Sequence, residues 1–86
     1  MYIVVPFQMF DAEQNILFYN DNDECIKKDY VATPNLAAAL YGFCAEDPTI
    51  ERVDIVGNPA YVEKIKRQMK TKFAFNDQIE INIIQR

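Results

Sequence analysis

The chain contains no histidine, serine or tryptophan, and it has only two glycines and two cysteines. Without histidine, the commonest general base, histidine-activated nucleophiles and most zinc sites are excluded. Two glycines are too few for a glycine-rich phosphate loop. Two cysteines, Cys25 and Cys44, do not make a disulfide framework, so we expect free thiols in a reducing, cytoplasmic setting. These absences predict a protein that is not an enzyme and uses no metal or cofactor.

Long apolar runs are also absent. No stretch approaches the roughly 18 residues needed to cross a membrane. The first ten residues carry Pro6 and no basic residue, which is not typical of a secretory signal. Half of the 86 residues are apolar, which indicates one folded domain over residues 1–86 and no membrane partner. From size alone, such a chain would suit an accessory protein of a virus or a mobile element.

Charge is unevenly distributed along the chain, although the formal net charge is only −4. Residues 1–51 contain nine acids and two bases, whereas residues 52–86 contain four acids and seven bases. Neutralisation of phosphates dominates the affinity of proteins for nucleic acids, so the acidic first half argues against a general nucleic-acid binder. The second half can still form a local basic patch.

The order of secondary structure follows from hydrophobic patterns and turn residues. Apolar runs rich in β-branched and aromatic residues predict strands, and polar turns over 11–15 and 20–24 separate the first three of them. Pro6 interrupts the hydrogen-bond ladder of the first strand. Thr33 is the expected N-cap of the first helix, which must end by Pro48. The predicted elements are strands 2–10, 16–19 and 25–31, a helix within 32–48, strand 50–57, helix 59–73 and strand 78–84.

This β-β-β-α-β-α-β order resembles the core of the ribonuclease H-like fold. The resemblance covers most of the chain as topology, and it implies a mixed sheet in two or three layers. The order is equally compatible with another mixed arrangement, such as a ferredoxin-like sheet with an added strand. The expected fold class is therefore α/β (α+β), a small mixed sheet with two helices.

The resemblance does not extend to nuclease chemistry. Nucleases of that fold hold two metal ions with carboxylates from the first strand, the first helix and the end of the fourth strand. Here the first strand offers no acid before Asp11, and the first helix offers none before Glu46. Val56, Gly57 and Asn58 occupy the end of the fourth strand. We expect no nuclease activity.

The junction after the fourth strand is the stretch most similar to an anion site. A strand, a glycine and a helix start expose backbone N–H groups and the positive end of the helix dipole. However, Pro59 has no N–H, and Asn58 is a favourable N-cap whose side chain can occupy the same amides. Two interpretations stay open, nucleotide or phosphate binding at Gly57 and Asn58, or a purely structural crossover.

The second helix holds five of the nine basic residues. Lys64, Arg67 and Lys70 spread over the side opposite its apolar stripe, which fits either a nucleic-acid surface or an ordinary solvated face. At roughly 100° per residue, the stripe itself contains Val62, Ile65, Met69 and Phe73.

The first helix has almost no charged side chain along its length. Leu36, Leu40, Phe43 and Cys44 share one face and are expected to pack on the sheet. A helix that is apolar all round is usually buried on more than one side. Either other parts of the chain cover its second face, or that face binds a protein, with Tyr41 as an aromatic anchor. The predicted interface consists of Ala37, Ala38, Tyr41 and Ala45.

The function that these patterns favour is a non-catalytic protein-interaction or regulatory module. We expect it to self-associate as a homodimer or to bind another protein. The alternative is nucleotide or nucleic-acid binding through Gly57, Asn58 and the basic residues Lys64, Arg67 and Lys70.

Overall fold

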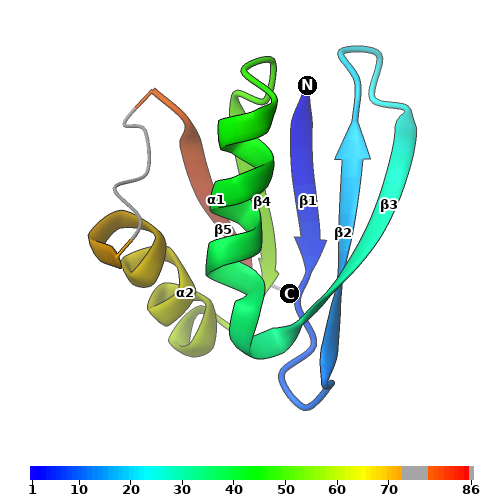
Figure 1. Cartoon of the computed structure of the whole chain (residues 1–86). Coiled ribbons are helices and arrows are strands. Elements are labelled where there is room, and N and C mark those ends of the chain that lie inside the picture. The colour runs from blue at the N-terminus through cyan, green and yellow to red at the C-terminus, as the bar shows by residue number, and fades with distance from the viewer. Residues whose placement is uncertain (73–77, 86) are drawn as a thin grey trace.

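A computed structural model describes residues 1–72 and 78–85. The predicted order of three strands, a helix, a strand, a helix and a strand is confirmed, as is the α/β class with one small mixed sheet. A short 3-10 turn precedes the first helix (Figure 1). The elements are β1 (Tyr2–Pro6), β2 (Glu13–Tyr19), β3 (Cys25–Ala32), η1 (Thr33–Asn35), α1 (Leu36–Glu46), β4 (Arg52–Gly57), α2 (Pro59–Lys72) and β5 (Glu80–Gln85).

The five strands are arranged in the order β3-β2-β1-β4-β5. The first three strands form an antiparallel meander, and β4 and β5 add to β1 in parallel. Parallel neighbours need a long crossover, which α1 and α2 supply before β4 and β5. The strand order, which the sequence left open, is thus defined, while the resemblance to the ribonuclease H-like fold stays a prediction.

Both helices cover the same face of the sheet, so the fold has two layers (Figure 1). Burial alternates along β1, where Ile3 and Val5 are fully buried and Tyr2, Val4 and Pro6 are only half-buried. Val53 and Ile55 of β4 are likewise buried beneath the helices. No described element covers the opposite face, which is called the open face below.

The hydrophobic core lies between the helices and the sheet. Buried side chains of all the long elements except β3 contribute to it, and half-buried Val31 adds the contribution of β3. Burying such side chains is the main stabilising term of a small domain, at about 25 cal/mol per Å² of apolar surface. The core consists of Ile3, Val5, Ile16, Phe18, Leu36, Ala37, Leu40, Cys44, Ile50, Val53, Ile55, Val62, Met69 and Ile81.

The boundaries of the first two strands differ from the prediction. β1 ends at Pro6 rather than at residue 10, and β2 begins at Glu13, within the predicted turn over 11–15. Pro6 has no N–H for the β2 ladder, and β1 pairs with β2 only from Tyr2 to Val4. On its other side β1 pairs with β4 as far as Pro6. The predicted interruption at Pro6 is therefore confirmed, and it affects only one neighbour.

The ends of α1 are set by different groups from those predicted. Thr33 is not an N-cap, because no side-chain cap bond is made at either η1 or α1. Its hydroxyl instead donates to the carbonyl oxygen of Asp11, 2.5 Å away. The other end is as predicted, since Asp47 before Pro48 has an extended conformation with φ −124° and ψ 98°.

The start of α2 is capped by Asn58, as predicted. Its Oδ1 accepts the N–H of Ala60 at 3.0 Å. Val62 and Met69 are fully buried, and Ile65 packs against the core. The predicted stripe is thus confirmed for these three residues, whereas Phe73 lies outside the described residues.

The thiols of both cysteines are free, as predicted. Cys25 is exposed, whereas Cys44 is buried in the core. Burial raises the pKa of Cys44 to about 11, because the thiolate would lose its hydration. None of the helices in the described ranges is both long and apolar enough to cross a membrane.

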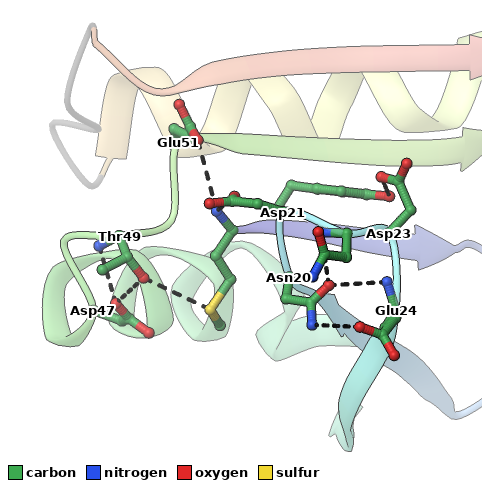
Figure 2. Close-up of polar contacts among 10 residues, drawn as sticks. Asn20, Asp21, Asp23, Glu24, Asp47, Thr49 and Glu51 are labelled. Carbon is green, nitrogen blue, oxygen red and sulfur yellow. Dashed lines mark hydrogen bonds and ion pairs between the residues drawn. The ribbon is translucent and has the colours of Figure 1, made fainter.

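Polar contacts close the connections at the amino end of β1 (Figure 2). In the β2–β3 turn, Oδ1 of Asn20 accepts the N–H groups of Asn22 and Glu24, and Asp23 has a left-handed φ of 61°. After α1, Oδ1 of Asp47 accepts the backbone N–H and the hydroxyl of Thr49 at 3.0 and 2.6 Å. These two hydrogen bonds lower the pKa of Asp47.

We expect Thr49→Val to raise the pKa of Asp47 toward its ordinary value. The carboxylate loses the hydroxyl donor and keeps the backbone N–H, so the charged form is less favoured. A pKa lowered by folding stabilises the protein at neutral pH, and this contribution is lost as the pH falls through the folded-state pKa. Carbon-detected NMR titration of the Asp47 carboxyl measures the change. Thr71→Val, which removes a hydroxyl bonded to the Arg67 carbonyl, should leave that pKa unchanged.

Candidate functional site

A cleft of about 500 Å³ lies at the carboxyl ends of the three parallel strands, β1, β4 and β5. Its walls are the loop after β1, the start of α2 and the last residue of β5. Open α/β sheets commonly bind ligands outside the carboxyl ends of their parallel strands. The lining residues are Phe7, Gln8, Met9, Phe10, Asp11, Gly57, Asn58, Pro59, Tyr61 and Gln85.

The loop over residues 7–11 is held in place by the side chain of Gln14. Oε1 of Gln14 accepts the N–H of Gln8 at 2.8 Å, and its Nε2 donates to the Gln8 carbonyl at 2.7 Å. The carboxamide thus continues the pairing between β1 and β2 that Pro6 interrupts. Nε2 also donates to Oγ1 of Thr33 at 2.9 Å, which ties the loop to the start of the first helix. Sequence reasoning missed Gln14, because a glutamine beside a turn gives no signal of burial.

A tight turn then directs two apolar side chains into solvent. The N–H of Asp11 donates to the Gln8 carbonyl at 3.2 Å, which places Met9 and Phe10 at the two central positions of the turn. Phe10 is 91% exposed. A phenylalanine this exposed at a turn tip is available for contact with another molecule.

Gly57 brings the loop and α2 close together. A Cβ added at this residue would lie 3.2 Å from a methyl of Val62 and 3.3 Å from Cβ of Phe7. A side chain at position 57 would therefore force the cleft walls apart. This close packing explains why position 57 is a glycine, and a bound phosphate is not needed to explain it.

The amides at the start of α2 already have partners. Pro59 has no N–H, and the N–H of Ala60 donates to Oδ1 of Asn58. The N–H groups of Tyr61 and Val62 both donate to the Asn58 carbonyl, at 3.0 and 3.1 Å. A phosphate at this helix start would have to displace the Asn58 side chain. The geometry thus gives little support to the predicted anion site at Gly57 and Asn58.

The basic residues of α2 do not surround the cleft. Lys64, Arg67 and Lys70 are exposed as predicted, but none of them is among the residues that line it. The charged residue in the described lining is Asp11. The structure therefore does not bring the two parts of the predicted nucleic-acid site, Gly57–Asn58 and the cations, into one cleft.

The predicted interface on α1 is only partly at the surface. Ala38, Tyr41 and Ala45 are exposed, and Tyr41 has 38% of its surface accessible. Ala37 is 5% exposed and belongs to the core, so it cannot contact a partner. Ala37 directly follows Leu36 and lies three residues before Leu40, and all three side chains are buried on the core side of α1. The exposed surface of α1 is thus smaller than predicted.

The open face of the sheet carries a polar network that the sequence did not indicate. Asp54 accepts a hydrogen bond from Nε of Arg52 at 3.1 Å and another from Nδ2 of Asn82 at 3.0 Å. The Arg52 guanidinium lies 4.1 Å from the ring centroid of Tyr2, which stacks on Tyr19. Arg52 lies two residues before Asp54 on the same strand, whereas Asn82 is its paired neighbour on β5.

An apolar row on the open face continues directly into the cleft. Pro6 is paired with Val56, and Val56 is paired with Ile84. The residue after each of them, on β1, β4 and β5, lines the cleft. Ile84 is 45% exposed. The cleft and this row therefore form one surface, and Met9, Phe10 and Tyr61 are its other exposed apolar side chains.

Comparisons of the chain with protein families, with curated proteins and with solved structures gave no match.

We expect Gln14→Leu to lower the free energy of unfolding by about 2–3 kcal/mol, because Gln8 and Thr33 lose buried hydrogen-bond partners. Urea denaturation followed by circular dichroism measures this change. In NMR spectra, the amide signals of residues 7–11 should shift or broaden as the loop loses its support. Asn15→Leu, at the exposed neighbouring position on β2, is the matched control. Equal stabilities of the two variants would contradict the assigned role of Gln14.

Proposed function

We propose that this protein is a non-catalytic module that binds an apolar segment of a partner protein in the cleft. The observation that carries this proposal is the gathering of exposed apolar side chains at one end of the sheet. Met9, Phe10 and Tyr61 line the cleft with 37%, 91% and 41% of their surfaces accessible. Burying one such side chain against a partner contributes about 1.5–3 kcal/mol.

The shape and chemistry of the cleft support a protein segment rather than a phosphate. Apolar and aromatic walls with a few polar groups are typical of binding sites. Asn58 and Gln85 add side-chain amides that can bond a partner backbone, and Asp11 adds one negative charge. A nucleotide or nucleic acid would instead meet this carboxylate and helix amides that already have partners.

The exposed part of α1 is a second surface that suits a protein partner or a second copy of the chain. It consists of Ala38, Tyr41 and Ala45, with the aromatic ring between small residues. Tyr41 and Tyr61 have nearly equal exposure, at 38% and 41%. This similarity makes the two tyrosines a matched pair for deciding which surface binds.

We expect peptides selected from a phage-displayed library on the wild-type protein to bind at the cleft. Phe10→Ala and Tyr61→Ala should each raise the dissociation constant about tenfold or more, as loss of a central aromatic anchor does. Tyr41→Ala should leave it unchanged. Fluorescence anisotropy measures the constants, and thermal unfolding of each variant controls for stability.

Two outcomes would place the binding site elsewhere, and a third would contradict both protein-binding surfaces. Weaker binding by Tyr41→Ala alone would place the interface on α1, and sedimentation equilibrium would then show whether a second copy is the partner. Amide shifts over residues 57–61 on titration with ATP or a short oligonucleotide, removed by neutralising Lys64, Arg67 and Lys70, would support the anion alternative instead. Unaltered binding by all three aromatic variants would contradict both protein surfaces.

A further inference from the structure

The two edge strands of the sheet differ in how they are protected from pairing with another chain. β3 carries three consecutive charged residues, Lys27, Lys28 and Asp29, and its register with β2 shifts between Phe18 and Tyr19. Charges and irregularities of this kind discourage strand addition at an edge. β5 has neither feature after Glu80, because its remaining residues, Ile-Asn-Ile-Ile-Gln, are uncharged and its register with β4 has no shift.

The backbone of β5 presents a regular row of hydrogen-bonding positions that no other strand in the described part of the chain uses. The N–H of Glu80 donates to the Glu51 carbonyl at 3.0 Å, so Glu80 faces β4. In a parallel ladder every second residue faces the same neighbour. Asn82 and Ile84 therefore also face β4, whereas the N–H and C=O groups of Ile81, Ile83 and Gln85 point to the outer edge. No strand of the described ranges pairs with that edge.

Helix geometry places two lysines of α2 on the side of the molecule where this edge lies. α2 packs over β4 and β5, with α1 on its other flank (Figure 1). Val62 and Met69 face the sheet, and Ile65 packs against the core. α2 is right-handed and runs antiparallel to β4 (Figure 1). With Val62 and Met69 toward the sheet, this handedness turns Lys66 and Lys70 to the flank of α2 that lies away from α1. These two cations are four residues apart, so they follow one line along the helix on the β5 side.

We infer that the edge of β5 binds an extended, acidic segment of a partner protein as a sixth strand. The backbone of this segment pairs with Ile81, Ile83 and Gln85, and its acidic side chains on the helix-covered side face Lys66 and Lys70. A second copy of the chain does not fit this edge as well, since it would bring an identical row of cations against the first. The charge of α2 thus selects an acidic partner.

The edge of β5 and the cleft are different sites that meet at one residue, Gln85. Gln85 ends β5 and also lines the cleft. An added strand that runs past Gln85 would enter the cleft beside Tyr61. One partner can therefore use both surfaces. Variants of the cleft still allow the strand-addition site to be tested by itself.

The first test uses a short acetylated and amidated peptide in which valine and glutamate alternate. Hydrogen exchange of the free protein, followed by NMR, should be fast at the amides of Ile81 and Ile83 and slow at those of Asn82 and Ile84. The peptide should slow exchange at Ile81 and Ile83 and leave β3 unchanged. The same peptide with lysine in place of glutamate should give at least tenfold weaker protection, and added salt should weaken the binding of the acidic peptide.

Two matched pairs of variants locate the contact. Gln85→Pro removes an outward N–H at an exposed edge position, where proline is tolerated, and should weaken peptide binding about 3- to 10-fold. Gln85→Ala keeps that N–H but loses the same side chain, so the additional weakening in Gln85→Pro relative to Gln85→Ala measures the contribution of the N–H. Lys66→Gln with Lys70→Gln should weaken binding, whereas Lys64→Gln with Arg67→Gln, which removes the same charge from the rest of α2, should not.

Each failure has its own meaning. No protection of Ile81 and Ile83 at millimolar acidic peptide would overturn the inference. Equal binding of the acidic and basic peptides would overturn the role of Lys66 and Lys70. Protection of the same amides without peptide, together with a dimer in sedimentation equilibrium, would assign the edge to a second copy instead. Phe10→Ala should not change the exchange pattern, so failure at β5 and failure at the cleft are distinguishable.

Discussion

Pairing of β1 with β4 is the constraint on which the rest of the structure depends. Residues Tyr2–Pro6 pair in parallel with Arg52–Val56, which joins the antiparallel meander to the parallel half of the sheet. A parallel neighbour requires a crossover, so α1 must pass over the sheet to reach β4, and α2 repeats the step to reach β5. Both crossovers lie on one face, and the other face stays open (Figure 1).

The same pairing produces the cleft. Pro6 ends the ladder toward β2 while the ladder toward β4 continues, so the chain leaves the sheet between its two halves. The Gln14 carboxamide replaces the missing backbone pair and fixes the loop that follows. Gly57 allows that loop to approach α2. One proline, one glutamine and one glycine thus position Phe10 and Tyr61 around a common space.

Charge separates the surfaces of the molecule. Near the amino end of β1, the N-terminal ammonium lies between Asp21 and Glu51, and Asp23 accepts the Tyr2 hydroxyl (Figure 2). The opposite end of β1 carries exposed apolar side chains, and the flank of α2 beside β5 carries Lys66 and Lys70. A small domain without histidine can still discriminate partners through such an arrangement, because complementary charge adds specificity to apolar contact.

The sequence by itself determined the order of elements, the fold class, the Asn58 cap and the end of α1 before Pro48. These features follow from local patterns of apolar, capping and turn residues, which act over a few positions. Only the tertiary structure decided the strand order, the burial of Gln14 and Ala37, the Asp54 network and the position of Phe10 beside Tyr61. Most of these features depend on contacts between residues far apart in the chain, such as Asp54 with Asn82 and Gln14 with Thr33, and such contacts leave no periodic signal in a single sequence.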